Sequence, residues 1–216
     1  DFLFVNKMAY GYSRYSCPFA ACPIPGRINV PFLSGDPQQG DVVVFRHPVN
    51  GEDYIKRLIG LPGDKVQVKN GLVYINGAEL PQVDAGIFTE IYEAQGSMGN
   101  SPRCSNAPVG NGGTCEKIRS VETLPNGVQH NVLNIDTNGY ADNTDVFTVP
   151  EGNYFFMGDN RDNSMDSRFA QTVGGVGMVP AEYLVGRADR IMFSSAGRSM
   201  LAFWTWRSDR FFKGIE

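Results

Sequence analysis

Residues 65–75 read Lys-Val-Gln-Val-Lys-Asn-Gly-Leu-Val-Tyr-Ile, and this stretch decides the fold class. Its first half alternates polar and apolar side chains, which is the pattern of a strand with one buried face. Asn70 and Gly71 then supply a dipeptide that strongly favours a two-residue hairpin turn. Because a second apolar run follows the turn directly, the stretch predicts an antiparallel β-hairpin.

Further apolar runs of strand length lie on both sides of this hairpin. Turn residues separate them, and long runs with the 3.6-residue period of a helix are scarce. We therefore expect an all-β fold of mostly antiparallel strands. The other expected strands cover residues 41–46, 53–61, 86–94, 117–123, 128–135, 146–149, 153–157, 177–179 and 184–193.

The middle of the chain carries two long stretches, residues 96–114 and 136–145, that are rich in turn-forming residues. Long loops of this kind are typical of an elaborated insertion and not of a core. We therefore predict that both ends of the chain, residues 1–64 and 151–216, form one β core. Residues 65–150 are expected to form an inserted β domain with long loops.

The composition argues against some classes of function. The net charge of the 216 residues is −4, so the chain has no excess of basic residues for binding nucleic acid. No run approaches the ~20 apolar residues that a membrane-spanning helix needs. The chain begins inside an apolar run, residues 2–5, and we interpret this start as a cut within a longer protein.

Four cysteines fall into two local pairs, Cys17 with Cys22 and Cys104 with Cys115. Both pairs lie in loop-like sequence, and local pairing in loops fits disulfides formed in an oxidising compartment such as the periplasm. The sequence alone allows three connectivities, and four free thiols are the alternative. We favour the Cys104–Cys115 pair. The spacings typical of zinc sites do not occur, so no metal is expected.

Residues 200–213 combine aromatic and basic side chains, among them Trp204, Trp206 and Arg207. Tryptophan is favoured at membrane–water interfaces because its ring has an apolar body and a polar edge. The segment is therefore either a contact with a lipid surface or a half-buried strand with an exposed basic tail. The sequence leaves both open.

A lysine lies inside the apolar strand expected at residues 53–61. Side chains alternate along a strand, so Tyr54, Lys56 and Leu58 share one face. Burial among such neighbours lowers the pKa of an amine and leaves a neutral base that can take a proton from a serine hydroxyl. A lysine whose ammonium group reaches solvent is the commoner alternative for an isolated strand lysine.

The polar stretch at residues 158–168 reads Gly-Asp-Asn-Arg-Asp-Asn-Ser-Met-Asp-Ser-Arg and directly follows an expected strand. Polar loops at strand ends are common places for binding and catalytic sites. The spacing does not fit a calcium loop, because Ser167 stands where the turn glycine belongs and no glutamate closes the loop. Its three carboxylates repel one another unless arginines such as Arg57, Arg161 and Arg168 pair with them.

Residues 53–64, Asp-Tyr-Ile-Lys-Arg-Leu-Ile-Gly-Leu-Pro-Gly-Asp, resemble the lysine motif of bacterial type I signal peptidase, also called leader peptidase. Residues 158–168 resemble the most specific loop of the same family, and residues 1–11 and 185–187 resemble further family segments. These proteins are membrane-bound proteases that use a Ser–Lys dyad to remove signal peptides from exported proteins. The resemblance implies a signal-peptidase-like β core, while the insertion is not diagnostic.

The resemblance also implies roles for individual residues. Lys56 is the general base, and Ser164 hydrogen-bonds its amine and orients it. The signal peptide is expected to add as a strand beside the lysine strand, with its small side chains in small apolar pockets. The supporting ion pairs implied are Arg57 with Asp159 and Asp166 with Arg168, and the substrate-binding residues implied are Asp53, Tyr54, Ile55 and Val44.

The nucleophilic serine of the family belongs to a segment upstream of Asp1. We therefore expect it to be absent from this chain, which should be inactive alone because one member of a catalytic unit is missing. The protein implied is a serine endopeptidase held in the bacterial inner membrane, with its catalytic domain facing the periplasm. Its partners are secretory preproteins, cleaved after Ala-x-Ala-like sites, and the membrane lipid surface, with no cofactor and no nucleic acid.

Two alternatives are weighed against this hypothesis. The first is a catalytically inactive periplasmic binding module of the same fold, although such a module has no need of a positioned lysine amine. The second is a self-cleaving repressor-type Ser–Lys peptidase, a class that lacks a loop like residues 158–168 and carries no large insertion.

Overall fold

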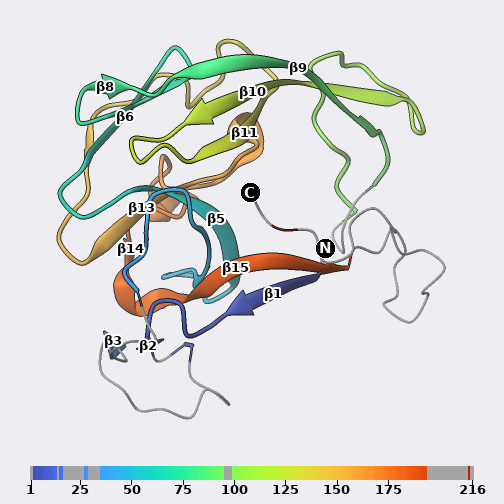
Figure 1. The fold of residues 1–216 in the computed structure, drawn as a ribbon. Helices are drawn as coiled ribbons and strands as arrows, with labels where there is room; N and C mark the ends of the chain where they lie inside the picture. The colour runs from blue at the N-terminus through green and yellow to red at the C-terminus, as the bar shows by residue number, and fades with distance from the viewer. Residues whose placement is uncertain are drawn as a thin grey trace.

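Strands from both ends of the described chain pair in one six-stranded sheet, with the order β1-β15-β4-β5-β13-β14 (Figure 1). The computed structural model describes residues 2–13, 15–16, 27–28, 35–94, 99–193 and 214. All neighbouring strands of this sheet are antiparallel. The strands are β1 (Phe2–Asn6), β4 (Val42–Arg46), β5 (Asp53–Gly60), β13 (Asn153–Met157), β14 (Val179–Pro180) and β15 (Leu184–Phe193).

The remaining strands form smaller antiparallel sheets. One has the order β12-β6-β7-β8, another has the order β11-β10-β9, and β2 pairs with β3. Their bounds are β2 (Tyr12–Ser13), β3 (Arg27–Ile28), β6 (Lys65–Lys69), β7 (Leu72–Ile75), β8 (Ala78–Glu79), β9 (Gln82–Ile91), β10 (Thr114–Thr123), β11 (Gln129–Asn134) and β12 (Phe147–Thr148). Helical structure in the described segments comprises the short 3-10 turns η2 (Arg161–Asn163), η3 (Gln171–Val173) and η4 (Ala181–Tyr183), so the predicted all-β class is confirmed.

The hairpin predicted from the sequence is confirmed. Strands β6 and β7 pair antiparallel with Lys69 opposite Leu72. Asn70 and Gly71 occupy the turn with φ values of 49° and 78°. Both are in the left-handed region that a two-residue hairpin turn of this type requires, which explains why this dipeptide stands there.

One hydrophobic core joins the main sheet to the β6–β7 hairpin. Ile59 of β5 and Phe155 of β13 pack in the same buried cluster as Val66 and Val73 of the hairpin. The hairpin that lies between β5 and β13 in the sequence therefore helps to bury the surface of the main sheet. The division into a β core and an inserted domain at residues 65–150 stays a prediction.

Strand boundaries differ from the sequence expectation in the three-stranded sheet. Strand β9 begins at Gln82 and not at residue 86, because it passes through an irregularity at Gly86, where φ is 81°. Glycine in a strand is read from sequence as a break, but it also allows the extra residue of a β-bulge. Strand β10 likewise begins earlier than expected, at Thr114.

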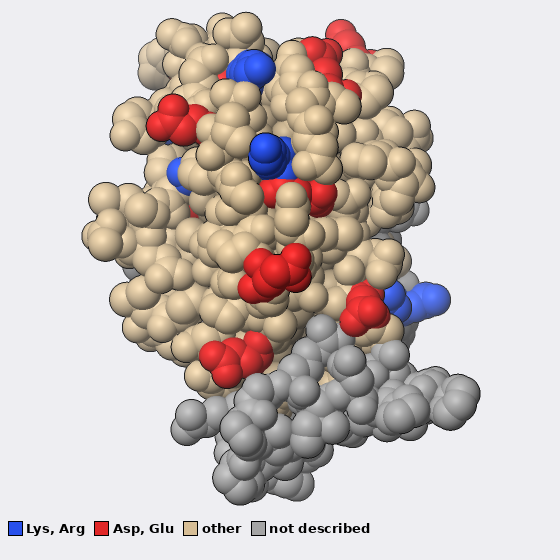
Figure 2. Space-filling model, turned by 90° about the vertical axis from the view of Figure 1, so that its left-hand side faces the viewer, with Lys and Arg blue, Asp and Glu red and all other residues tan. Residues whose placement is uncertain are grey.

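Cys104 and Cys115 form a disulfide with an S–S distance of 2.03 Å, as the sequence favoured. Cys17, Cys22 and the aromatic and basic stretch 200–213 lie outside the described residues. No described helix is long and apolar enough to cross a membrane. On the face drawn in Figure 2, the coloured acidic and basic side chains are scattered, and the basic ones form no continuous patch.

Candidate active site

Lys56 lies on β5, with its side chain on the buried face of the main sheet. In the ladder with β4 it stands opposite Val43, which is fully buried. Leu58, two residues further along the same face, is also fully buried. Burial lowers the pKa of the Lys56 amine below its ordinary value of 10.5 and outweighs the attraction of Asp166, which raises it. The lysine is therefore easier to deprotonate than one in water.

The Lys56 amine meets the hydroxyl of Ser164. The distance from Lys56 Nζ to Ser164 Oγ is 2.9 Å, although the two residues are 108 positions apart in the chain. Ser164 is only 8% exposed and directly follows η2. Because a lysine side chain has many rotamers, a fixed hydroxyl partner is needed to hold its amine in one place.

Gly158 makes this approach possible. A Cβ atom at position 158 would lie 2.2 Å from Ser164 Oγ and 3.5 Å from Lys56 Nζ. The first distance is far below van der Waals contact, so any side chain here would displace Ser164. The Gly158 amide also donates a hydrogen bond to Asp166 Oδ2 at 3.0 Å, which ties both ends of the loop together.

Asp166 and Arg168 form a buried ion pair under this loop. Arg168 Nε donates to Asp166 Oδ1 at 2.9 Å and Nη2 donates to Oδ2 at 3.0 Å, with Asp166 fully buried. The neighbouring Ser167 exchanges hydrogen bonds with the backbone of Phe156, its hydroxyl accepting from the amide and its own amide donating to the carbonyl. The loop is thereby fixed to the end of β13.

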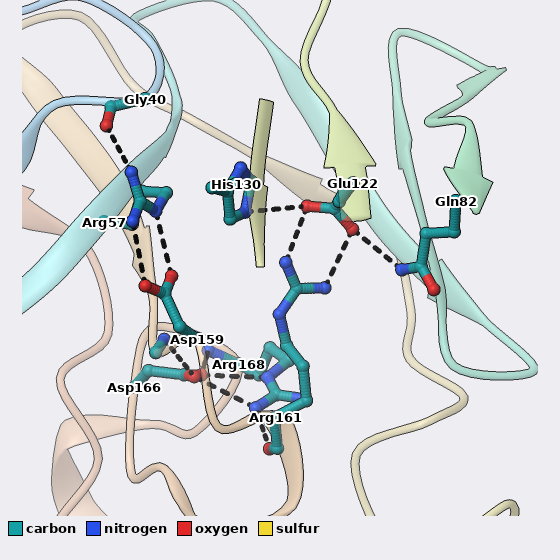
Figure 3. A network of polar contacts seen from close by, with 10 residues as sticks. Gly40, Arg57, Gln82, Glu122, His130, Asp159, Arg161, Asp166 and Arg168 are labelled. Atoms are coloured by element: carbon teal, nitrogen blue, oxygen red, sulfur yellow. Dashed lines mark hydrogen bonds and ion pairs between the residues drawn. The ribbon is translucent and has the colours of Figure 1, made fainter. Parts of the chain in front are cut away.

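Arg57 and Asp159 form the second pair implied by the resemblance (Figure 3). Arg57 Nε and Nη2 donate to the two carboxylate oxygens of Asp159, each at 2.9 Å, and Nη1 donates to the Gly40 carbonyl at 2.9 Å. A two-pronged arrangement of this kind fixes orientation as well as distance. The guanidinium thus joins the start of the loop to the segment before β4.

The four residues expected to bind substrate divide between the two faces of the sheet. Val44 and Ile55 are opposite one another in the β4–β5 ladder, and Ile55 is 40% exposed. Tyr54 packs on the other face against the rings of Phe45 and His47. Asp53 forms an ion pair with Arg46 at 3.1 Å. Val44 and Ile55 can therefore line one small apolar surface, while Tyr54 belongs to the packing beneath.

The half of β5 that carries these residues has one open edge. β4 pairs with β5 from Asp53 to Arg57, whereas β13 pairs with it from Arg57 to Gly60. On the β13 side, residues 53–56 have no strand partner within the described ranges. An unpaired edge of this kind offers backbone groups to an extended peptide.

The sequence did not single out the partner of Arg161. The expectation that Arg161 pairs with a loop carboxylate is wrong, because its guanidinium pairs with Glu122 of β10. Both side chains are buried, with exposures of 3% and 0%. Strand β10 carries four charged residues, Glu116, Lys117, Arg119 and Glu122, so its sequence does not mark Glu122 as the buried partner.

Replacing Asp166 with asparagine is expected to lower the free energy of unfolding by about 3–5 kcal/mol, since the buried Arg168 loses its counter-ion. Asp189→Asn is the matched control, because Asp189 and its partner Arg187 have side-chain exposures of 38% and 44%, so water can reach the group left behind. Urea unfolding followed by circular dichroism measures both. Equal losses in the two variants would contradict the assigned role of burial.

If Lys56 is the base that the family resemblance implies, replacing Ser164 with alanine in the full-length protein is expected to reduce kcat for peptide cleavage by about tenfold or more and to leave KM unchanged, because the hydroxyl holds the amine of Lys56. Steady-state kinetics with the substrate implied by the resemblance, a signal peptide, test this. Ser120→Ala, on β10, is the control. A loss confined to KM would instead place Ser164 among the residues that bind substrate.

A lysine amine held by a hydroxyl group beside an unpaired strand edge is an arrangement suited to peptide hydrolysis. Comparison with known proteins gives the same class of protein, a peptidase. Residues 1–193 match a peptidase family model, described as signal peptidase, peptidase S26. The chain belongs to this signal peptidase family.

Individual relatives agree with the family match. The signal peptidase I of Rickettsia typhi is 38% identical over 205 residues, which cover 90% of this chain and 66% of that protein. The signal peptidase I of Rickettsia akari is 38% identical, and the match covers 90% of this chain and 65% of that protein. The signal peptidase I of Rickettsia bellii is 39% identical, and the match covers 90% of this chain and 60% of that protein. The chain thus spans somewhat less than two thirds of the length of these curated relatives. A crystal structure of a signal peptidase I from Enterococcus faecalis is 29% identical and covers 71% of this chain and 97% of that chain, with a TM-score of 0.37.

Proposed function

We propose that this chain is the periplasmic body of a membrane-anchored signal peptidase that cleaves signal peptides after Ala-x-Ala-like sites by a Ser–Lys dyad. The observation that carries the proposal is the 2.9 Å contact between the partly buried Lys56 amine and the Ser164 hydroxyl. This contact lies on the strand whose edge at residues 53–56 is open to a peptide.

In the proposed mechanism, neutral Lys56 takes the proton of a nucleophilic serine that a segment before Asp1 supplies. The serine oxygen attacks the scissile carbonyl carbon, and the peptide C–N bond breaks as Lys56 returns the proton to the leaving amine. Lys56 then removes a proton from water, the water oxygen attacks the ester carbonyl carbon, and the bond to the serine oxygen breaks as Lys56 returns the proton to that oxygen. Ser164 keeps the Lys56 amine in the same position during formation and hydrolysis of the acyl-enzyme. Without that upstream serine, residues 1–216 alone should be inactive.

Substrate selection in this proposal depends on the two faces of the added strand. Side chains of an extended peptide alternate, so every second one turns toward the face of Val44 and Ile55. A shallow surface between these side chains admits small residues and rejects large ones by volume. The exported preprotein is the substrate, the inner membrane is the location and the lipid surface is the second partner. The reaction as proposed draws on no cofactor.

The direct test is cleavage of a preprotein by the full-length protein in lipid vesicles, with mass spectrometry of the new N-terminus. We expect one cut directly after an Ala-x-Ala-like site. The matched control substrate carries phenylalanine in place of the last alanine and should not be cut. Binding of the signal peptide without cleavage would favour the inactive binding module instead.

The pH dependence of cleavage follows from the lowered pKa of Lys56. The amine acts as a base only when neutral, so kcat/KM should rise with pH and level off above the pKa of Lys56. Because burial lowers that pKa, the midpoint of the rise should lie below 10.5. The profile is measured from initial rates, with Lys65→Ala as a control that leaves it unchanged. A midpoint at or above 10.5 would contradict a buried lysine base.

A further inference from the structure

A buried carboxylate outside the dyad is contacted by polar side chains from three separate segments (Figure 3). Arg161 of η2 donates to both oxygens of Glu122, from Nη1 to Oε2 at 3.0 Å and from Nη2 to Oε1 at 2.6 Å. Gln82 of β9 donates to Oε2 at 2.9 Å. His130 of β11 places Nε2 at 3.3 Å from Oε1. Glu122 thus joins the three-stranded sheet to the loop that carries Ser164.

The ionised states of Glu122 and Arg161 depend on each other. Burial acts to raise the pKa of Glu122, but the charge of Arg161, the close His130 ring and the hydrogen bonds from Arg161 outweigh it, so the pKa falls below its ordinary value. Burial acts to lower the pKa of Arg161, and Glu122 reverses that effect. Both groups are therefore ionised, and removing either charge leaves the other buried without a counter-ion.

Arg161 connects Glu122 to the loop segment that positions Ser164. It is the first residue of η2, which ends directly before Ser164. Its carbonyl accepts a hydrogen bond from Arg168, the residue that pairs with Asp166. The loop formed by residues 158–168 is therefore fixed by Arg168, which binds Asp166 and the Arg161 carbonyl, and by Glu122, which binds the Arg161 side chain.

Further contacts dock the same loop on the three-stranded sheet. The Leu133 amide of β11 donates to the Asp159 carbonyl at 2.8 Å. Asp162 Oδ2 accepts from the Ile135 amide at 2.7 Å and from the Asp136 amide at 2.9 Å. Arg103, next to the disulfide, donates to the Asp162 carbonyl at 2.7 Å. The Glu122 pair is the buried, charged member of this docking surface.

We propose that Glu122 is a positioning residue of the site: by holding Arg161 it fixes residues 158–168, and so sets the Ser164 hydroxyl against the Lys56 amine. Its catalytic consequence rests on the proposed function. The structural part, that Glu122 orders this loop, does not.

The test compares two charge-removing variants of the full-length protein on the same sheet. Glu122→Gln removes the anchor, and Glu90→Gln removes the ion pair of Glu90 with Lys117, which lies on β9 and β10 outside the loop contacts. Hydrogen–deuterium exchange is read for peptides covering residues 158–168 and, separately, β13. We expect exchange of the loop to become about tenfold faster in Glu122→Gln, with β13 protected as before, and to stay unchanged in Glu90→Gln.

Cleavage kinetics give the second readout. Glu122→Gln should lower kcat by about tenfold with KM unchanged, and Glu90→Gln should leave both constants unchanged when each is assayed below its own unfolding temperature. Equal loop exchange in Glu122→Gln and wild type would overturn the proposal. If wild type cleaves no preprotein, the proposed function fails, while the exchange data still decide the role of Glu122.

A double variant guards against misfolding. Glu122→Gln with Arg161→Gln leaves no uncompensated buried charge, so it should fold where Glu122→Gln alone does not. If Glu122 acts through Arg161, the loop of the double variant should exchange faster than that of wild type, and at the same rate as the loop of Arg161→Gln alone. Exchange as slow as in wild type overturns it.

Discussion

Lys56→Ala in the full-length protein is expected to abolish signal-peptide cleavage, with kcat/KM reduced about 10⁴-fold or more. Lys56 is the only group in the described ranges with a recorded hydrogen bond to the Ser164 hydroxyl. In the proposed mechanism it moves every proton, so its loss removes a member of a unit that works together. The fold should persist, because alanine replaces a partly buried amine with a small apolar group.

Cleavage of a preprotein, followed on gels and by mass spectrometry, measures this effect. Lys65→Ala is the matched control, because Lys65 is an exposed lysine at the start of β6. Binding of the signal peptide should survive in Lys56→Ala, since the open edge of β5 consists of backbone groups. Cleavage that continued in the Lys56 variant would remove the lysine from the mechanism and with it the Ser–Lys dyad.

Gly158→Ala is expected to lower kcat at least about 100-fold while the protein stays folded. The new methyl group would stand 2.6 Å from Ser164 Cβ and 2.2 Å from its hydroxyl oxygen, so the serine must move away. Its displacement also frees the Lys56 amine. The loss should therefore exceed that of Ser164→Ala, which removes the hydroxyl but leaves the loop in place.

Gly110→Ala is the control for this substitution, because a Cβ atom at Gly110 meets nothing within 4 Å. Steady-state kinetics and thermal unfolding are measured for both variants. A normal kcat in Gly158→Ala would show that Ser164 need not hold its observed position. A large fall in unfolding temperature would assign the glycine to stability and not to the site.

Much of the fold follows from local patterns. Alternation and Asn-Gly turns predict β6 and β7 to the residue, because both signals depend on neighbours in the chain. The start of β9 is missed, because Gly86 interrupts a pattern that the strand continues through. Pairing of β1 with β15 has no local signal at all, since it joins opposite ends of the described chain.

The candidate site divides in the same way. Lys56 and Ser164 are found through two local motifs, each readable within about a dozen positions, and the structure brings them together. The packing of Tyr54 against Phe45 and His47 is missed, because alternation assigns a face but not its neighbours. Glu122 is missed because its partner Arg161 lies 39 positions away and neither residue marks the other.

The pairing of distant strands also sets the order in which the protein can mature. Lys56 is made 108 residues before its serine partner, and the sheet beside it closes only when β13 and β15 have been made. Contacts between such distant segments form slowly, after the loops between them have closed. A ribosome-bound chain that ends before the second motif therefore has no assembled base. In the proposed enzyme, proteolytic competence would appear only after the segment that carries β15 has been made and has folded.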